Sequence, residues 1–566
     1  MVRFLSSKPL IAGVLSLLIG SYGQAAADES ADTIYRNGAI VTLNATNDIA
    51  QAVAVKDGNI VAVGSDQEID SLKGDRTRVV ELQGKTLIPG FYDAHSHIVA
   101  TGIIGLFQVN LNSPPIGQIK TIDDIVALLQ SKALETPEGE WIQGFGYDDT
   151  LLAEGRHPTR YDLDRASTKH PIEIRHVSGH LTVANTLALE LAGISADTPQ
   201  PEGGVIRKDD VGKPTGILDE APATDIVTGV IPPMAPQKYF TAINYAANLY
   251  AAKGVTTAND GAASMGLVSL LKAASEQPGL LPIRVNAWPT ADAAEAAYAL
   301  ELKGDKLSLG GTKEFADGSI QAYTGYLSQP YHTAFHGDED YKGFSRHDRE
   351  VLAAKILKIH RSGKQVMIHT NGDAAIDDAL YGFSKAQQAF PRDDARHVLI
   401  HTQMAREDQL DRMSELGIIP SFFELHTYYW GDRHSDIFMG PERAARMSPT
   451  RSAVQRGIRF TLHADTPVVP MDPMLMIWSA VSRTSTSGRV IGAEQTITPL
   501  QALRATTIDA AYQNFEEKVK GSVEVGKLAD FAILSSNPLT VKPGTIKDIQ
   551  VLETIVGDKR VYPLNK

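Results

Sequence analysis

Cysteine is absent from all 566 residues. Its absence excludes disulfide bonds, thiolate metal ligands, a cysteine nucleophile and a lipid-modified N-terminal cysteine. A Gly-x-Ser-x-Gly elbow is also missing, so the sequence offers no serine nucleophile of that kind. Runs of lysine and arginine are absent as well, and the formal net charge is -13. This acidic balance argues against nucleic acid as a partner.

The first 27 residues have the pattern of a signal peptide. Arg3 and Lys8 give a positive start, residues 10–19 form an apolar run that is short for a membrane span, and residues 25–27 are three alanines. We therefore expect residues 1–27 to be cleaved during export. The mature chain would then be periplasmic or secreted, without a stable membrane anchor. An uncleaved anchor is the alternative.

The rest of the chain divides into β-rich ends and a centre of mixed character. Residues 28–88 and 515–566 contain short strand-like runs with turns between them, and we expect these two ends to pair in one small β-sandwich. Residues 89–514 alternate strand-like and helix-like stretches, which predicts an α/β fold with parallel strands in a (β/α)₈ barrel. Residues 105–238 interrupt this alternation after the first strand. We interpret them as an insertion that caps the barrel mouth.

Short apolar runs of the centre end repeatedly in a residue that can bind a metal. These residues are His95 and His97 after the run at residues 86–90, then Lys313, His369, His401 and Asp465. A barrel keeps its active site at the C-terminal ends of its strands, so we expect these side chains to converge. Imidazole and carboxylate ligands without thiolate favour zinc, with manganese, iron or nickel as alternatives.

The motifs around these residues resemble the metal-dependent amidohydrolase superfamily, and within it the YtcJ-like branch (amidohydrolase family 3), which includes N-substituted formamide deformylases. They lie at residues 89–97, 313–319, 369–373, 464–468 and 521–530. Two departures stand out. Residues 371–374 read Asn-Gly-Asp-Ala where the branch has Ile-Gly-Asp-Arg, and His463-Ala464 precede Asp465 where the branch has Gly-Ser.

The resemblance implies a ligand set for one or two divalent ions. His95, His97 and Asp465 would hold one ion, and His369 and His401 a second. Lys313 would be carboxylated and bridge the two ions; a structural lysine, or a single ion, is the alternative. Asp465 would also be the catalytic base that moves a proton from water to the departing amine.

Three further residues are candidates for substrate binding. His180 and Glu220 lie in the insertion, beside glycine-containing turns, and His426 follows the seventh expected strand. The alternative for each is an ordinary structural role. For His463 two positions are possible: its side chain lines the same face as that of Asp465, or it packs in the core. The aromatic run at residues 428–430 is expected to form an apolar wall or to pack against a helix.

Together these expectations predict a metal-dependent hydrolase that cleaves a C–N bond, in an amide or an N-substituted formamide, of a small-molecule substrate. One alternative is a metal-dependent deaminase or another hydrolase of cyclic substrates. A second alternative is a non-catalytic envelope protein that uses the same fold for binding or regulation. The sequence leaves open whether the chain forms a homo-oligomer.

Overall fold

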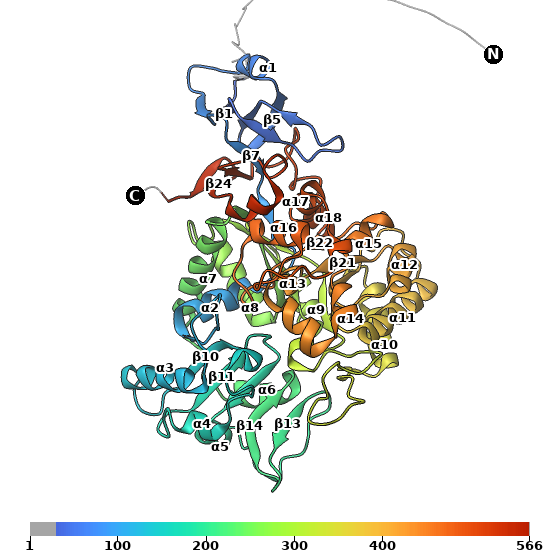
Figure 1. The fold of residues 1–566 in the computed structure, drawn as a ribbon. Coiled ribbons are helices and arrows are strands. Elements are labelled where there is room, and N and C mark those ends of the chain that lie inside the picture. Colours follow the sequence, from blue (N-terminus) through green and yellow to red (C-terminus); the bar gives the residue numbers. More distant parts are fainter. Residues whose placement is uncertain (1–29, 565–566) are drawn as a thin grey trace, which may run out of the picture.

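The computed structural model describes residues 30–564 (Figure 1). The expected signal peptide, residues 1–27, lies outside the described residues. Among residues 30–564, no helix combines the length and the apolar character that crossing a bilayer requires.

The centre of the molecule is a set of parallel strands. Four pair in the order β17-β16-β15-β8 and five in the order β18-β19-β20-β21-β22. Their bounds are β8 Phe91–Tyr92, β15 Val255–Ala263, β16 Arg284–Pro289, β17 Leu307–Leu309, β18 Thr312–Phe315, β19 Val366–Thr370, β20 Val398–His401, β21 Ile419–Phe422 and β22 Thr461–Leu462. A parallel bridge between Thr290 and Lys313 joins the two sheets. This α/β arrangement is consistent with the predicted barrel.

The first central strand differs from the one that we expected. The run before His95 is divided between two sheets: β7 (Thr86–Pro89) pairs with β2 (Ala39–Val41) and β23 (Phe531–Leu534), whereas β8 pairs with β15. Gly90 lies at the break, where a Cβ atom would come within 2.1 Å of the Thr256 side chain. A glycine therefore lets the chain pass from one sheet to the next. The run at residues 86–90, which we counted as the strand before His95, pairs in the end sheet, and β8 is the central strand instead.

Helices cover the central strands, whose side chains are buried along their whole length in β19 and β20. Their bounds are α2 Ile98–Phe107, α7 Pro236–Ala251, α8 Met265–Ser275, α9 Ala294–Tyr298, α10 Arg349–Arg361, α11 Asp373–Ala389, α12 Glu407–Leu416, α13 Leu425–Arg433, α15 Thr450–Gln455 and α16 Pro473–Ser482. Local sequence sets their starts. In α16, Asp472 accepts a hydrogen bond from the Leu475 N–H, and Pro473 takes the first helical position.

Strands from both ends of the chain lie at one end of the molecule (Figure 1). A six-stranded sheet has the order β25-β24-β23-β7-β2-β3, and a four-stranded sheet has the order β5-β4-β1-β6. The remaining strands are β1 Thr33–Arg36, β3 Ile49–Ala50, β4 Ala52–Lys56, β5 Asn59–Gly64, β6 Arg78–Glu81, β24 Val551–Val556 and β25 Lys559–Tyr562. Both sheets contribute to one hydrophobic cluster, with Tyr35 from the smaller sheet and Phe531 from the larger. Buried Arg284 of β16 bonds to Asp530, which ties this cluster to the centre.

The opposite end holds a third sheet, which we call the insertion sheet (Figure 1). Its order is β13-β14-β12-β11-β10-β9, and its strands run from β9 (Val109–Asn110) to β14 (Pro214–Asp219). The others are β10 Ile142–Tyr147, β11 Ile172–His176, β12 Leu181–Ala184 and β13 Val205–Lys208. Buried Asp148, just after β10, accepts hydrogen bonds from Arg433 (2.6 Å) and Trp430 (3.0 Å) of α13. A buried ion pair therefore joins the insertion sheet to the central helices.

Candidate metal centre

The segment after β8 carries His95 and His97 toward the carboxylate of Asp465. Both Nε2 atoms lie 3.4 Å from Asp465 Oδ1. Backbone bonds hold the two segments together, because the Asp465 N–H donates to the His95 carbonyl (3.2 Å) and the His97 N–H to the Thr466 carbonyl (2.8 Å). The His95 ring stacks on Trp288, with centroids 5.2 Å apart. Backbone hydrogen bonds therefore hold the two segments together, and ring stacking holds the His95 side chain in place.

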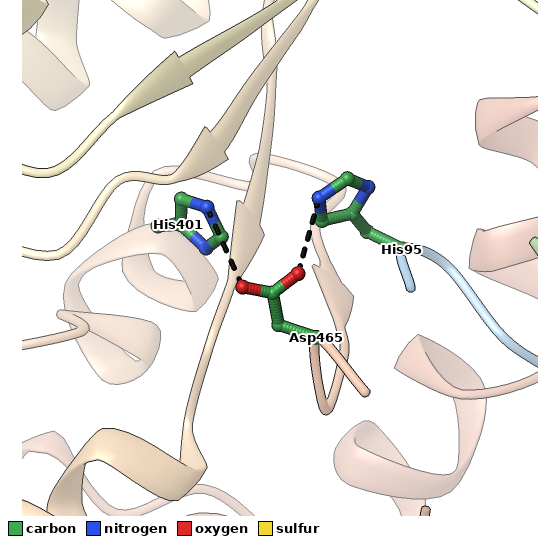
Figure 2. Close-up of side chains that lie close together, drawn as sticks. All are labelled: His95, His401 and Asp465. Atoms are coloured by element: carbon green, nitrogen blue, oxygen red, sulfur yellow. Dashed lines mark ion pairs between the residues drawn. The ribbon is translucent and has the colours of Figure 1, made fainter. Parts of the chain in front are cut away.

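The donor atoms fit a divalent cation. Asp465 Oδ1 is buried and has no hydrogen-bond partner among the described residues, and Oδ2 lies 4.0 Å from His401 Nε2 (Figure 2). Ligand atoms around a tetrahedral zinc ion, with bonds of about 2.05 Å, are roughly 3.3 Å apart. The distances from Asp465 Oδ1 to His95 Nε2 and to His97 Nε2 each match the spacing of two ligands on one ion. His95, His401 and Asp465 also form one of the two groups in the described chain whose donor atoms all lie within 4.8 Å.

Burial keeps the imidazoles neutral. Desolvation is the main cause that lowers the pKa of His95, His369 and His401 well below the usual value, and the neighbouring positive groups add to it. Neutral rings offer lone pairs, so the contacts of His95 and His401 to Asp465 are not ion pairs. The backbone is also strained here, with φ of +66° at His401 and +52° at Asp465. Such strain concentrates at functional sites.

A second partner orients His401. Its Nδ1 lies 3.0 Å from His463 Nε2, and His463 Nδ1 lies 2.9 Å from Ser421 Oγ, which also accepts a hydrogen bond from Thr461. A free lone pair on His401 Nε2 requires that Nδ1 carries the hydrogen and donates it to His463. His463 then donates to Ser421. His463 is fully buried and is not among the residues that line the cavity, so the core position is the one observed, and it contacts the site through His401.

Asp317 has the same relation to His369. Its Oδ1 lies 3.2 Å from His369 Nδ1, and its two oxygens accept backbone N–H bonds from Tyr326, Asn371 and Gly372. Burial raises the pKa of Asp317 to about 8, although the three N–H bonds oppose this shift. Sequence reasoning missed this residue. The one signal in the sequence was its position in the motif at residues 313–319, four residues after Lys313.

Lys313 of β18 is buried beside the same carboxylate. Burial lowers the pKa of its amine to about 7, with Asp465 opposing and Arg346 adding to the shift. Its Nζ lies 4.8 Å from the centroid of the Phe315 ring. The Nζ atom makes no hydrogen bond or ion pair with a described residue. A neutral amine is the form that reacts with CO₂, so the environment is suitable for carboxylation.

The proposed ligands line one cavity of about 340 Å³. His95, His97, Lys313, His369, His401, Asp465, His180 and Glu220 are among its lining residues. His180 Nδ1 lies 2.9 Å from buried Glu220, and its ring centroid lies 4.9 Å from that of His369. The structure therefore brings two of the three expected substrate-binding residues to the metal-competent cluster.

The third expected residue lies elsewhere. His426 in α13 is buried against Phe423, with ring centroids 4.2 Å apart, and its centroid is 6.4 Å from that of His401. It does not line the cavity. The aromatic run at residues 428–430 is also outside it, because Trp430 turns to Asp148 of the insertion sheet. Substrate contact by His426 therefore stays a prediction without geometric support.

Comparisons with known proteins agree with this geometry. Putative amidohydrolase YtcJ of Bacillus subtilis is 29% identical over 94% of this chain and 99% of its own length. The N-substituted formamide deformylase of Arthrobacter pascens is 28% identical over 93% and 97%. A solved structure of an uncharacterized metal-dependent hydrolase from Pyrococcus horikoshii is 26% identical, covers 90% of this chain and 99% of its own, and has a TM-score of 0.71. The model of the Amidohydrolase family matches residues 78–562, and the chain therefore belongs to this family of metal-dependent hydrolases.

Proposed function

We propose that the chain hydrolyses a C–N bond in an amide or N-substituted formamide of a small molecule. The observation that carries this proposal is that His95 and His97 both lie at ligand spacing from Asp465, in the same cavity as Lys313, His369 and His401. The likeness to N-substituted formamide deformylase supports the choice of bond. We also interpret the central strands as a closed (β/α)₈ barrel and the two end sheets as its sandwich.

The proposed ligands are His95, His97 and Asp465 for one ion, and His369 and His401 for a second, with Lys313 as a carboxylated bridge. Zinc suits this donor set best. When bound, the ions would supply Lewis acidity to the scissile carbonyl and to the attacking water.

The residues of the chain supply the remaining chemistry. Asp465 accepts a proton from the water whose oxygen adds to the carbonyl carbon, and it returns this proton to nitrogen as the C–N bond breaks. His463 and Asp317 hold the rings of His401 and His369 in place. His180, fixed at Nδ1 by Glu220, contacts the substrate beside His369.

The volume of the cavity limits the size of the substrate. A volume of about 340 Å³ is at the small end of ligand pockets, which fits a compact substrate rather than a polymer. Apolar side chains, including Ile104, Phe145 and Val468, line part of it and would contact an apolar substituent.

A substrate panel tests the proposal. Purified enzyme, loaded with zinc or manganese, is assayed on N-substituted formamides, other amides, esters, lactones, phosphoesters and aminated heterocycles. We expect turnover of the first two classes. Turnover confined to phosphoesters or aminated heterocycles would show that the reaction has been assigned incorrectly.

A further inference from the structure

The guanidinium of Arg346 has no hydrogen-bond acceptor in the described chain. It makes no hydrogen bond and no ion pair with residues 30–564, and its Nε is buried. The loop that carries it is fixed, because the Arg346 N–H donates to the carbonyl of Ala316 (2.8 Å), at the end of β18. A half-buried guanidinium presents five donors and is costly to leave unsatisfied. Its position therefore indicates a ligand.

Arg346 lines the catalytic cavity. Its Cζ lies 4.7 Å from the centroid of the Phe315 ring, and Lys313 Nζ lies 4.8 Å from the same centroid. The Phe315 ring in turn lies 5.7 Å from that of His369. One aromatic ring thus places the guanidinium beside two of the proposed ligands. A group bound by Arg346 would belong to the substrate.

Most other charged side chains of the cavity have contacts of their own. Glu220 is bonded to His180, Asp465 faces the histidines, and Arg175 lies 3.6 Å from Glu173. Asp225 is exposed, so water solvates its carboxylate. Arg346 is therefore a guanidinium of the cavity without a hydrogen-bonded or ion-paired partner among the described residues, and Glu220 is a carboxylate on which its charge acts at longer range.

We propose that Arg346 binds a carboxylate of the substrate, so that the enzyme prefers amides that carry a carboxylate close to the scissile bond, as N-acyl amino acids do. The planar fork of a guanidinium matches a carboxylate with two parallel hydrogen bonds. A single such group suits one negative charge better than the double charge of a phosphate. This inference rests on the proposed function, since it names the substrate class of the same site.

Two formamides that share the same N-formylphenethyl skeleton provide the test. N-formylphenylalanine and N-formylphenethylamine differ in the carboxylate alone, and each enantiomer of the first is assayed. We expect wild-type kcat/KM to favour the acid. Arg346→Gln should lower kcat/KM for the acid about 10- to 100-fold, the range for a hydrogen bond to a charged group, and should leave the neutral compound nearly unchanged. Arg346→Lys should retain part of the preference.

Arg349→Gln is the matched control, because Arg349 lies on α10, outside the lining of the cavity, where it pairs with Asp378 at 2.5 Å. It should leave the ratio of the two substrates unchanged. Circular dichroism establishes that each variant is folded. Equal loss for both substrates in Arg346→Gln, or no wild-type preference for the acid, would overturn the carboxylate site.

Binding of 3-phenylpropionate and 3-phenylpropanamide, measured by calorimetry, separates this inference from the proposed reaction. If neither formamide is hydrolysed but phenylpropionate binds the wild type and not Arg346→Gln, the reaction is wrong and the anion site stands. If phenylpropionate binds both proteins equally, the anion site is wrong whatever the enzyme hydrolyses.

Discussion

Replacement of His463 by alanine should weaken metal binding although His463 itself is not a proposed ligand. The change removes the 3.0 Å contact to His401 Nδ1 and the 2.9 Å contact to Ser421. His401 then loses the partner that fixes its tautomer and its ring. Partners of this kind typically change metal affinity by about 10- to 100-fold, which corresponds to roughly 1.4–2.7 kcal/mol.

The fold should become less stable as well. Each buried group left without its bond costs about 1–3 kcal/mol, and His463 is fully buried. Metal affinity is measured by competition with a chromogenic chelator, and stability by thermal unfolding of the metal-free protein. The two measurements separate an effect on the site from a general loss of stability.

His397 provides the matched control. It is buried just before β20, at the opposite end of the strand from His401, and its Nε2 lies 2.8 Å from His360 Nδ1. His397→Ala also breaks a buried histidine pair, so it should destabilise the protein by a similar amount and leave metal affinity unchanged. Equal metal affinity in His463→Ala and the wild type, or equal loss in both variants, would refute the reasoning.

Three other outcomes are expected. Asp465→Asn should abolish amide hydrolysis with a cooperative unfolding transition retained, and near-normal activity with metal bound would contradict its role as base. Lys313→Ala should lose an ion by elemental analysis and much of the activity, with partial rescue by added formate or acetate; an unmodified amine in the mass spectrum of active, metal-loaded protein would rule out the carbamate. Protein isolated from the cell envelope should have the intact mass of a chain cleaved near Ala27, and a chain that retains Met1 would disprove export with cleavage.

Residue type and position predicted the parts of the site that depend on strand ends. A histidine or lysine at the end of an apolar run is visible in the sequence, and the order of the runs placed Lys313 and His401 in one cavity. The break at Gly90 was not visible, because two apolar runs separated by a single glycine look like one strand. The Thr256 side chain, which leaves no space for a Cβ atom at residue 90, comes from a distant part of the chain.

Supporting residues were harder to predict. Asp317 and Arg346 acquire their roles from neighbours that other segments supply, and neither has a distinctive spacing in the sequence. The aromatic run at residues 428–430 shows the converse. Its composition suggested a wall of the cavity, but the Trp430 indole N–H found a buried acceptor, Asp148, on another sheet. A buried hydrogen bond of this kind outweighs a preference that is based on composition alone.

The ion pair between Asp148 and Arg433 limits how this architecture can be recombined. Burial opposes ionisation of Asp148, but Arg433 and the surrounding donors hold its pKa below the usual value. A chimera that received the insertion sheet of a relative without this aspartate would bury the Arg433 guanidinium without its counter-charge, at a cost of about 3–5 kcal/mol. A chimera that is designed to exchange substrate specificity between family members therefore has to include α13 together with the insertion sheet.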